Sequence, residues 1–134
     1  MKKKIFAFLL ALVLPLAGCA ALTGSDQPAG YRQVSAQEAM DMMAGQEDYL
    51  ILDVRTQAEY DGGHIPGAIC LPNEDIGRED PPQLPLKDQL ILVYCRSGNR
   101  SKQASDKLVK LGYTNIVEFG GIIDWPGETV SGME

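Results

Sequence analysis

The chain has 134 residues, of which 45% are hydrophobic, and its formal net charge at pH 7 is −6. This length fits one domain built around one hydrophobic core. General nucleic-acid binding needs a basic surface, so the acidic balance excludes it and we expect no nucleic-acid partner.

The N-terminus has the pattern of an export signal. A basic run at residues 2–4 precedes a nearly uniform apolar segment at residues 5–17, which is too short to cross a bilayer comfortably. The segment ends in Leu16-Ala17-Gly18-Cys19, which resembles a bacterial lipobox. We therefore expect residues 1–18 to be a lipoprotein signal peptide and Cys19 to carry the lipid. The protein would then be attached to a membrane in the cell envelope. The alternative is an ordinary signal peptide or an uncleaved anchor.

The residues that follow predict a tether and the start of a folded domain. Residues 20–30 are mostly small or polar and are typical of a flexible tether, which places the domain at residues 31–134. A short strand is expected at residues 31–34. Ser35 and Glu38 then fit the capping box of a helix.

A second strand and helix follow in the same pattern. Residues 49–54 form a continuous apolar run, as in a central strand buried on both faces. Asp53 lies near its carboxyl end, where it either orients a loop of the site or caps the strand. Thr56 and Glu59 repeat the capping box. We expect Arg55 and Glu59 to form a structural ion pair.

The second half of the chain continues the alternation. A turn at Pro66-Gly67 precedes a short strand that contains Cys70, and residues 73–89 are expected to form one helical turn and then a loop. The remaining elements are expected at these positions: strand 90–94, helix 101–111 ended by Gly112, strand 115–119 broken by Gly120-Gly121, and a short helix at 122–125. Strands alternating with helices indicate a single α/β domain with a mainly parallel central sheet and helices on both faces.

The segment between the strand at 90–94 and the next helix has the composition of an anion-binding loop. Cys95 stands where a strand ends and a helix begins, so free helix amides and the arginines Arg96 and Arg100 should stabilise its thiolate. Gly98 permits the tight backbone that such a loop needs. The alternative is that Cys95 is a small buried hydrophobic residue.

Three motifs in this order resemble a single rhodanese domain. The motifs are Leu52-Asp53-Val54-Arg55 with Glu59-Tyr60 and Gly63-His64-Ile65-Pro66-Gly67-Ala68, then Tyr94-Cys95-Arg96-Ser97-Gly98-Asn99-Arg100-Ser101, and then Gly120-Gly121 with Trp125. The resemblance implies a sulfurtransferase in which Cys95 takes a sulfane sulfur as a persulfide and passes it on.

The resemblance also implies roles and partners. The substrate-binding residues would be Arg96, Ser97, Gly98, Asn99, Arg100 and Ser101. Asp53 and Arg55 would support the loop from behind, and His64 would be a structural hydrogen-bonding residue. The donor would be a small anion such as thiosulfate, and the acceptor would be a thiol or cyanide. No metal or organic cofactor is implied, and we expect a monomer.

Three other functions stay open from the sequence. A cysteine phosphatase is disfavoured because Cys95 and Arg100 enclose only four residues, a shorter loop than phosphatases use to surround a phosphoryl group. A rhodanese-like binding module without turnover is disfavoured by the presence of Cys95. A thiol redox relay would pair Cys95 with Cys70.

Overall fold

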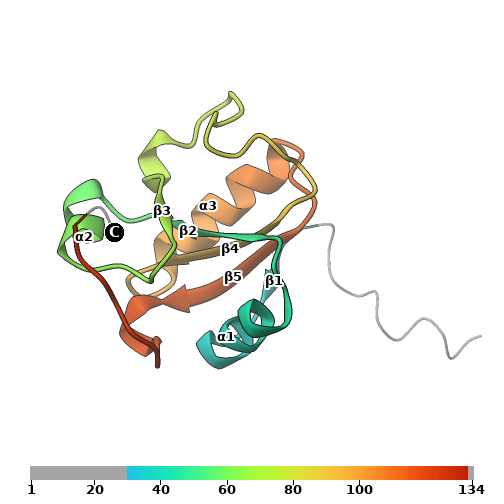
Figure 1. Ribbon diagram of the computed structural model, residues 1–134. Helices are drawn as coiled ribbons and strands as arrows, with labels where there is room; N and C mark the ends of the chain where they lie inside the picture. Colours follow the sequence, from blue (N-terminus) through green and yellow to red (C-terminus); the bar gives the residue numbers. More distant parts are fainter. Residues whose placement is uncertain (1–29, 133–134) are drawn as a thin grey trace, which may run out of the picture.

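The computed structural model describes residues 30–132 and places five strands in one sheet, with the order β1-β5-β4-β2-β3 (Figure 1). Cys19, the expected signal peptide and the tether up to residue 29 lie outside the described residues. The strands are β1 (Arg32–Gln33), β2 (Tyr49–Asp53), β3 (Ile69–Cys70), β4 (Leu90–Cys95) and β5 (Ile116–Gly121). All neighbouring pairs in the sheet are parallel, so the predicted α/β class is confirmed.

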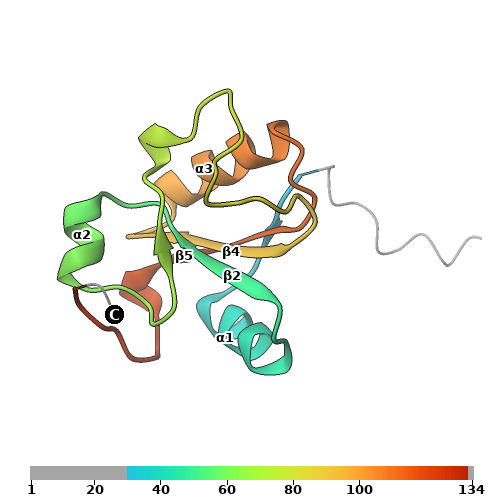
Figure 2. The same cartoon turned by 45° about the horizontal axis from the view of Figure 1, so that its top comes forward.

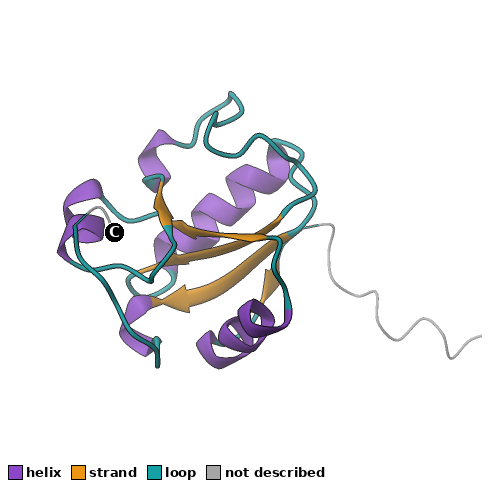
Figure 3. Ribbon diagram, viewed as in Figure 1, coloured by secondary structure: helices purple, strands orange, loops and turns teal. Residues whose placement is uncertain are grey.

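Helices cover both faces of this sheet, as predicted. The helices are α1 (Ala36–Gly45), α2 (Gln57–Gly62) and α3 (Asn99–Lys110), with short 3-10 turns η2 (Asn73–Asp75) and η3 (Ile122–Asp124). Figures 2 and 3 show α3 on one side of the sheet and α1 on the other. Parallel strands need crossover connections, and these connections bring helices onto both faces. Within residues 30–132, no helix has the length and apolar composition needed to span a membrane.

Both predicted capping boxes are present and fix where α1 and α2 begin. The Ser35 hydroxyl accepts from the amide of Glu38 at 3.1 Å, and the Glu38 carboxylate accepts from the amide of Ser35 at 2.8 Å. Thr56 and Glu59 make the same reciprocal pair at 3.2 and 3.0 Å. Each pair satisfies two amides that a helix would otherwise leave unpaired.

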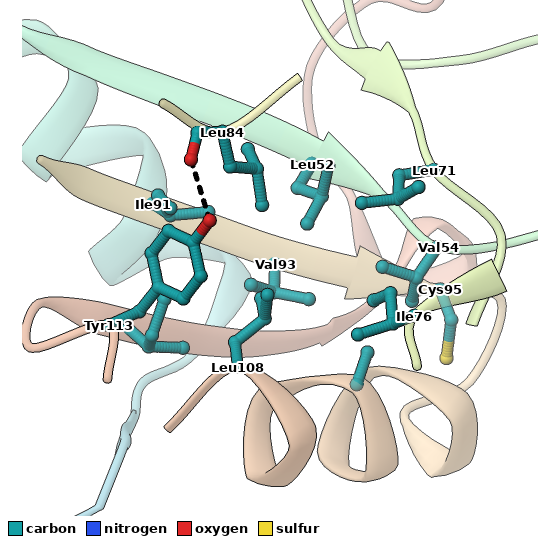
Figure 4. Packing of buried hydrophobic residues seen from close by; sticks show 12 residues of the cluster. Leu52, Val54, Leu71, Ile76, Leu84, Ile91, Val93, Cys95, Leu108 and Tyr113 are labelled. Atoms are coloured by element: carbon teal, nitrogen blue, oxygen red, sulfur yellow. Dashed lines mark hydrogen bonds between the residues drawn. The ribbon is translucent and has the colours of Figure 1, made fainter. Parts of the chain in front are cut away.

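The core is divided by the sheet into two clusters. Every residue of β4 is buried, and its alternate side chains enter different clusters. Ile91, Val93 and Cys95 pack on the side of α3, as Figure 4 shows, whereas Leu92 and Tyr94 pack on the side of α1. The two-residue period of a strand therefore delivers the Cys95 sulfur to the α3 face.

Two of the element boundaries that differ from the prediction bear on the Cys95 loop. Helix α3 begins at Asn99 rather than 101, because Gly98 adopts a left-handed conformation (φ 112°) and is itself the N-cap. Strand β5 continues through Gly121 instead of ending at 119, and Gly121 pairs with Cys95 after an irregularity in the ladder. The glycine pair therefore extends the strand to the level of the cysteine.

A buried polar network joins β2 to β4. The Asp53 carboxylate accepts from the Arg55 side chain, with a shortest distance of 2.7 Å, and from the Tyr94 hydroxyl at 2.8 Å. Tyr94 in turn accepts from the amide of Ile65 at 3.1 Å, and Arg55 donates to the carbonyl of Gly63 at 2.7 Å. The network ties the segment after α2 to the centre of the sheet.

Replacing Asp53 with alanine should destabilise the fold by about 3–5 kcal/mol, because it leaves the Arg55 guanidinium buried without its carboxylate. The Arg55 and Asp53 side chains are only 7% and 0% exposed. Urea denaturation of the purified domain measures the change. Asp80→Ala is the control, since it breaks an exposed pair with Lys87 and should cost no more than about 1 kcal/mol. Equal losses in the two variants would contradict the assignment.

Candidate active site

The Cys95 sulfur lies where β4 meets the amino end of α3, and the residue is only 1% exposed. The amide of Gly98 donates to the sulfur at 3.0 Å, and the Ser101 hydroxyl oxygen lies 3.4 Å from it. These contacts come from the unpaired amide end of a helix, which is where an anion is stabilised best. The structure therefore places the Cys95 thiol where the sequence predicted it, between the end of a strand and the start of a helix.

The same contacts shift the acidity of the thiol. Burial opposes the charged form, but the hydrogen bond with the Ser101 side chain and those from the amides of Ser101, Gly98 and Ser97 outweigh it, so the pKa of Cys95 lies below its ordinary value. The thiolate is the nucleophilic form of cysteine. A larger share of Cys95 is therefore reactive near neutral pH than for an ordinary cysteine.

The loop is held against the end of β5. The carbonyl of Arg96 accepts from the amide of Ile123 at 3.3 Å. A Cβ on Gly121 would overlap that carbonyl, so only glycine allows the two backbones to approach this closely. A Cβ built on Gly98 would lie 3.6 Å from the Cα of Gly120, so the two glycines lie close together in the same region. The glycine pair of β5 is thus part of the site rather than a simple strand break.

The predicted loop residues divide into two groups. The backbone of Ser97, Gly98 and Ser101 faces the sulfur, whereas the side chains of Arg96 and Asn99 are exposed. Among residues 30–132, no acidic side chain forms an ion pair with Arg96. Arg96 therefore remains the guanidinium beside the loop that is available to an anionic substrate.

Arg100 is used differently from the prediction. It forms a bidentate pair with Glu59, with N–O distances of 2.7 and 3.0 Å. This contact lowers the pKa of Glu59 to about 2. The expected Arg55–Glu59 pair was wrong, because Arg55 turns inward to Asp53 while Glu59 at the start of α2 faces the loop. Arg100 therefore fastens the loop to α2 through both of its terminal guanidinium nitrogens.

Asp53 and Arg55 form no hydrogen bond or ion pair with the loop at residues 96–101. Their side chains form hydrogen bonds with each other, with the Tyr94 hydroxyl and with the carbonyl of Gly63. Of the two readings of Asp53, the one in which it accepts amides of the loop is therefore wrong. Its influence on the site passes through Tyr94, the residue that precedes Cys95 on β4.

Ser101 reaches an acidic residue that the sequence analysis did not single out. Its hydroxyl lies 2.6 Å from a carboxylate oxygen of Glu118, a residue of β5 that is 2% exposed. The amide of Gly120 donates to the same oxygen at 2.8 Å. The sequence signal that could have identified Glu118 is its place as the one charged residue within the apolar run Ile116-Val117-Glu118-Phe119.

Cys70 is remote from Cys95. It pairs with Asp53, which pairs with Tyr94, so two strand spacings separate Cys70 from β4. Two spacings amount to about 10 Å, beyond the reach of a disulfide without backbone movement. Cys70 lines a separate cavity of about 430 Å³ whose walls include Asp75, Glu79 and Asp80, and burial raises the pKa of its thiol to about 11.

The remaining residues of the predicted motifs have structural contacts. His64 is fully buried, stacks on Tyr60 with ring centroids 3.7 Å apart and has its Nδ1 atom 2.8 Å from the carbonyl of Tyr60. Trp125 packs against Phe119. The part of the chain that the structure describes contains no cluster of His, Cys, Asp and Glu side chains suited to hold a metal ion.

A cavity of about 410 Å³ lies beside the loop. Its walls include Arg96, Arg55, Glu59 and the apolar residues Ile122 and Ile123. Ile123 is 61% exposed. A cation and an apolar wall therefore flank the approach to the loop, an arrangement suited to a small anionic molecule with or without an apolar group.

Comparisons with known proteins agree with this geometry. Residues 35–127 match the family model of the rhodanese-like domain. A protein of Allochromatium vinosum named sulfurtransferase is 38% identical over 94 residues, covering 69% of this chain and 86% of the relative. Thiosulfate sulfurtransferase PspE of Escherichia coli is 34% identical over 73 residues, covering 54% of this chain and 70% of the relative.

A solved structure shows the same fold. The rhodanese-like domain of an Anabaena protein has a TM-score of 0.66 and 30% sequence identity, covering 74% of this chain and 78% of that one. The family match at residues 35–127 contains β2 to β5, α3 and the Cys95 loop. On the fold, the loop and these similarities, the chain belongs to the rhodanese-like domain family.

Proposed function

We propose that this protein is a sulfurtransferase of the cell envelope that carries a sulfane sulfur on Cys95. The donor is thiosulfate or a persulfide, and the acceptor is a thiol or cyanide. The single observation that carries the proposal is the position of the Cys95 sulfur, which lies 3.0 Å from the amide of Gly98 at the amino end of α3. The relatives named sulfurtransferase support the same class of reaction.

The first half of the reaction loads the cysteine. The Cys95 thiolate attacks the outer sulfur of thiosulfate, a bond forms between the two sulfur atoms, and the bond to the sulfite group breaks. The electron pair of that bond leaves with sulfite. The exposed guanidinium of Arg96 attracts the anionic donor, and the loop amides stabilise the negative charge on sulfur.

The second half returns the enzyme to its resting state. A nucleophile attacks the outer sulfur of the Cys95 persulfide, and the bond between the two sulfur atoms breaks with its electron pair remaining on Cys95. The products are thiocyanate when cyanide attacks, or a new persulfide when a thiol attacks. The amide of Gly98 receives the regenerated thiolate, so both halves use the same stabilised anion.

The proposed location rests on the sequence of the N-terminus. The lipobox-like Leu16-Ala17-Gly18-Cys19 would leave the domain tethered by residues 20–30 to a lipid at Cys19. In Figure 1, the first described residues enter β1 at the end of the sheet opposite to the carboxyl ends of β4 and β5.

Two alternatives are weaker on the geometry. A binding module has no need of a cysteine with a lowered pKa held against helix amides. A redox relay needs Cys70 within disulfide reach, and two strand spacings separate it from β4.

Incubation of the purified domain with thiosulfate should add the mass of one sulfur atom to the peptide that contains Cys95. Cys95→Ser should abolish both the adduct and the formation of thiocyanate from cyanide, because the nucleophile is missing. Cys70→Ser is the matched control and should retain both. Intact-protein and peptide mass spectrometry provide the measurement. No adduct on the wild-type chain would overturn the sulfurtransferase proposal.

Arg96→Ala should raise the KM for thiosulfate about fivefold, equivalent to about 1 kcal/mol, with little change in Tm, because an exposed cation is lost from the approach to the loop. Arg100→Ala should lower Tm, because its pair with Glu59 fastens the loop to α2. Lys110→Ala removes the same charge from the far end of α3 and is the control. Steady-state kinetics and thermal unfolding separate the roles. A KM unchanged by Arg96→Ala would remove Arg96 from donor binding.

Cys19→Ser should abolish incorporation of a labelled fatty acid when the full chain is expressed in a bacterial host, because the acceptor sulfur is absent. Cys70→Ser is the control and should remain labelled. Gel analysis of metabolically labelled cells gives the result. Absence of label on the wild-type chain would show that residues 1–18 are not a lipoprotein signal.

A further inference from the structure

The Ser101 hydroxyl lies at a junction of four polar atoms. It is 2.6 Å from the Glu118 carboxylate, 2.9 Å from the carbonyl of Gly98, 3.3 Å from the carbonyl of Gly120 and 3.4 Å from the Cys95 sulfur. Three of these neighbours are oxygen acceptors, whereas the hydroxyl has one proton to donate. The neighbours therefore compete for that proton.

Distance and charge favour Glu118 in this competition. A hydroxyl that donates to a carboxylate makes a short bond, and the 2.6 Å separation is in the range of such charge-assisted bonds. With its proton directed at Glu118, the Ser101 oxygen presents lone pairs to Cys95. In that orientation it accepts from a neutral thiol but gives nothing to a thiolate.

Glu118 is an unusual neighbour for a nucleophilic sulfur. Its carboxylate is buried, accepts from Ser101 and the amide of Gly120, and forms no ion pair within residues 30–132. A second negative charge one hydroxyl group away opposes ionisation of Cys95. Neither the loading nor the discharge of sulfur described above needs this residue.

We propose that Glu118 is a positioning residue that holds the Ser101 hydroxyl proton and thereby limits how strongly the Cys95 thiolate is stabilised. Ser101 stabilises the thiolate only when its hydroxyl turns from Glu118 to the sulfur. In the persulfide state the negative charge lies on the outer sulfur, so the inner sulfur no longer needs that proton and Ser101 can bond to Glu118.

This inference rests on the proposed function for its consequence. Glu118 withholds a donor that the free thiolate needs and the loaded cysteine does not, and it therefore favours the persulfide over the discharged enzyme. A cysteine of higher pKa is a stronger nucleophile when ionised and a poorer leaving group. Glu118 should therefore assist the loading of sulfur and slow its transfer to the acceptor.

Other charged groups near the sulfur have assigned partners or exposed positions. Arg100 on α3 interacts electrostatically with Cys95 and is paired with Glu59. Arg96 in the loop is exposed. Tyr31, which precedes β1, interacts electrostatically with Glu118 on the neighbouring strand. Variants of Glu118 leave all of these groups in place, so a change in Cys95 can be attributed to the Ser101–Glu118 contact.

The test is the pKa of the Cys95 thiol, measured from the pH dependence of thiolate absorbance and of alkylation. Glu118→Gln should lower this pKa by about one pH unit, because it weakens the competing acceptor and removes a negative charge. Glu118→Asp keeps the charge but withdraws the carboxylate from Ser101, so it should also lower the pKa. It serves as the second variant if the glutamine variant fails to fold.

A double-mutant comparison isolates the contact with Ser101. Ser101→Ala should raise the thiol pKa more in the Glu118→Gln background than in the wild type, because only there is the hydroxyl free to donate to the thiolate. Asp106→Asn removes an exposed charge from α3 and is the control, with no expected change. In single-turnover assays, Glu118→Gln should discharge the persulfide to cyanide faster than the wild type.

Three results would overturn the proposal. These are an unchanged or raised thiol pKa in Glu118→Gln, a wild-type pKa in Glu118→Asp, and equal effects of Ser101→Ala in both backgrounds. The alkylation and absorbance measurements need no sulfur donor. Failure of the sulfurtransferase proposal would therefore appear as a missing persulfide and would leave the thiol measurements interpretable.

Discussion

The structure is organised around the need to keep negative charge on a sulfur atom that is almost out of water. Cys95 is 1% exposed, and burial alone would keep it as a neutral thiol. Amides at the amino end of α3 reverse that tendency, and they can do so only if the loop from Arg96 to Gly98 keeps one tight conformation. The neighbouring elements are best understood by how they hold that loop.

Two contacts fix the loop from opposite sides. The end of β5 receives the carbonyl of Arg96 where Gly121 leaves no side chain in the way, and Ile123 donates to that carbonyl. On the other side, Arg100 is clamped by Glu59. Behind the loop, Tyr94 connects β4 to the buried Asp53–Arg55 pair. The loop thus rests on β5, α2 and β2 together, which is the preorganisation that electrostatic stabilisation requires.

The sequence was enough to predict features that depend on neighbours in the chain. The capping boxes at Ser35 and Thr56, the strand and helix that flank Cys95, and the requirement for glycine at position 98 all follow from local patterns. The alternation along β4 likewise places Cys95 and Tyr94 on opposite faces.

Features that depend on pairing across the fold were harder to predict. Arg55 has two acidic neighbours in sequence, Asp53 and Glu59, and local spacing does not decide which one it meets. The choice depends on Arg100, which approaches Glu59 from a segment 41 positions away. The contact between Ser101 and Glu118 similarly requires the register of β5 against β4, which also carries that strand through Gly120 and Gly121.

Glu59 has two sets of partners that belong to different segments. One of its carboxylate oxygens closes the capping box of α2 by accepting from Thr56, and the same carboxylate accepts from both terminal guanidinium nitrogens of Arg100. The first turn of α2 cannot unwind without also releasing the arginine at the end of the active loop. Fraying of this short, exposed helix and loosening of the loop should therefore occur as one cooperative event, which couples the surface of α2 to the order around the sulfur.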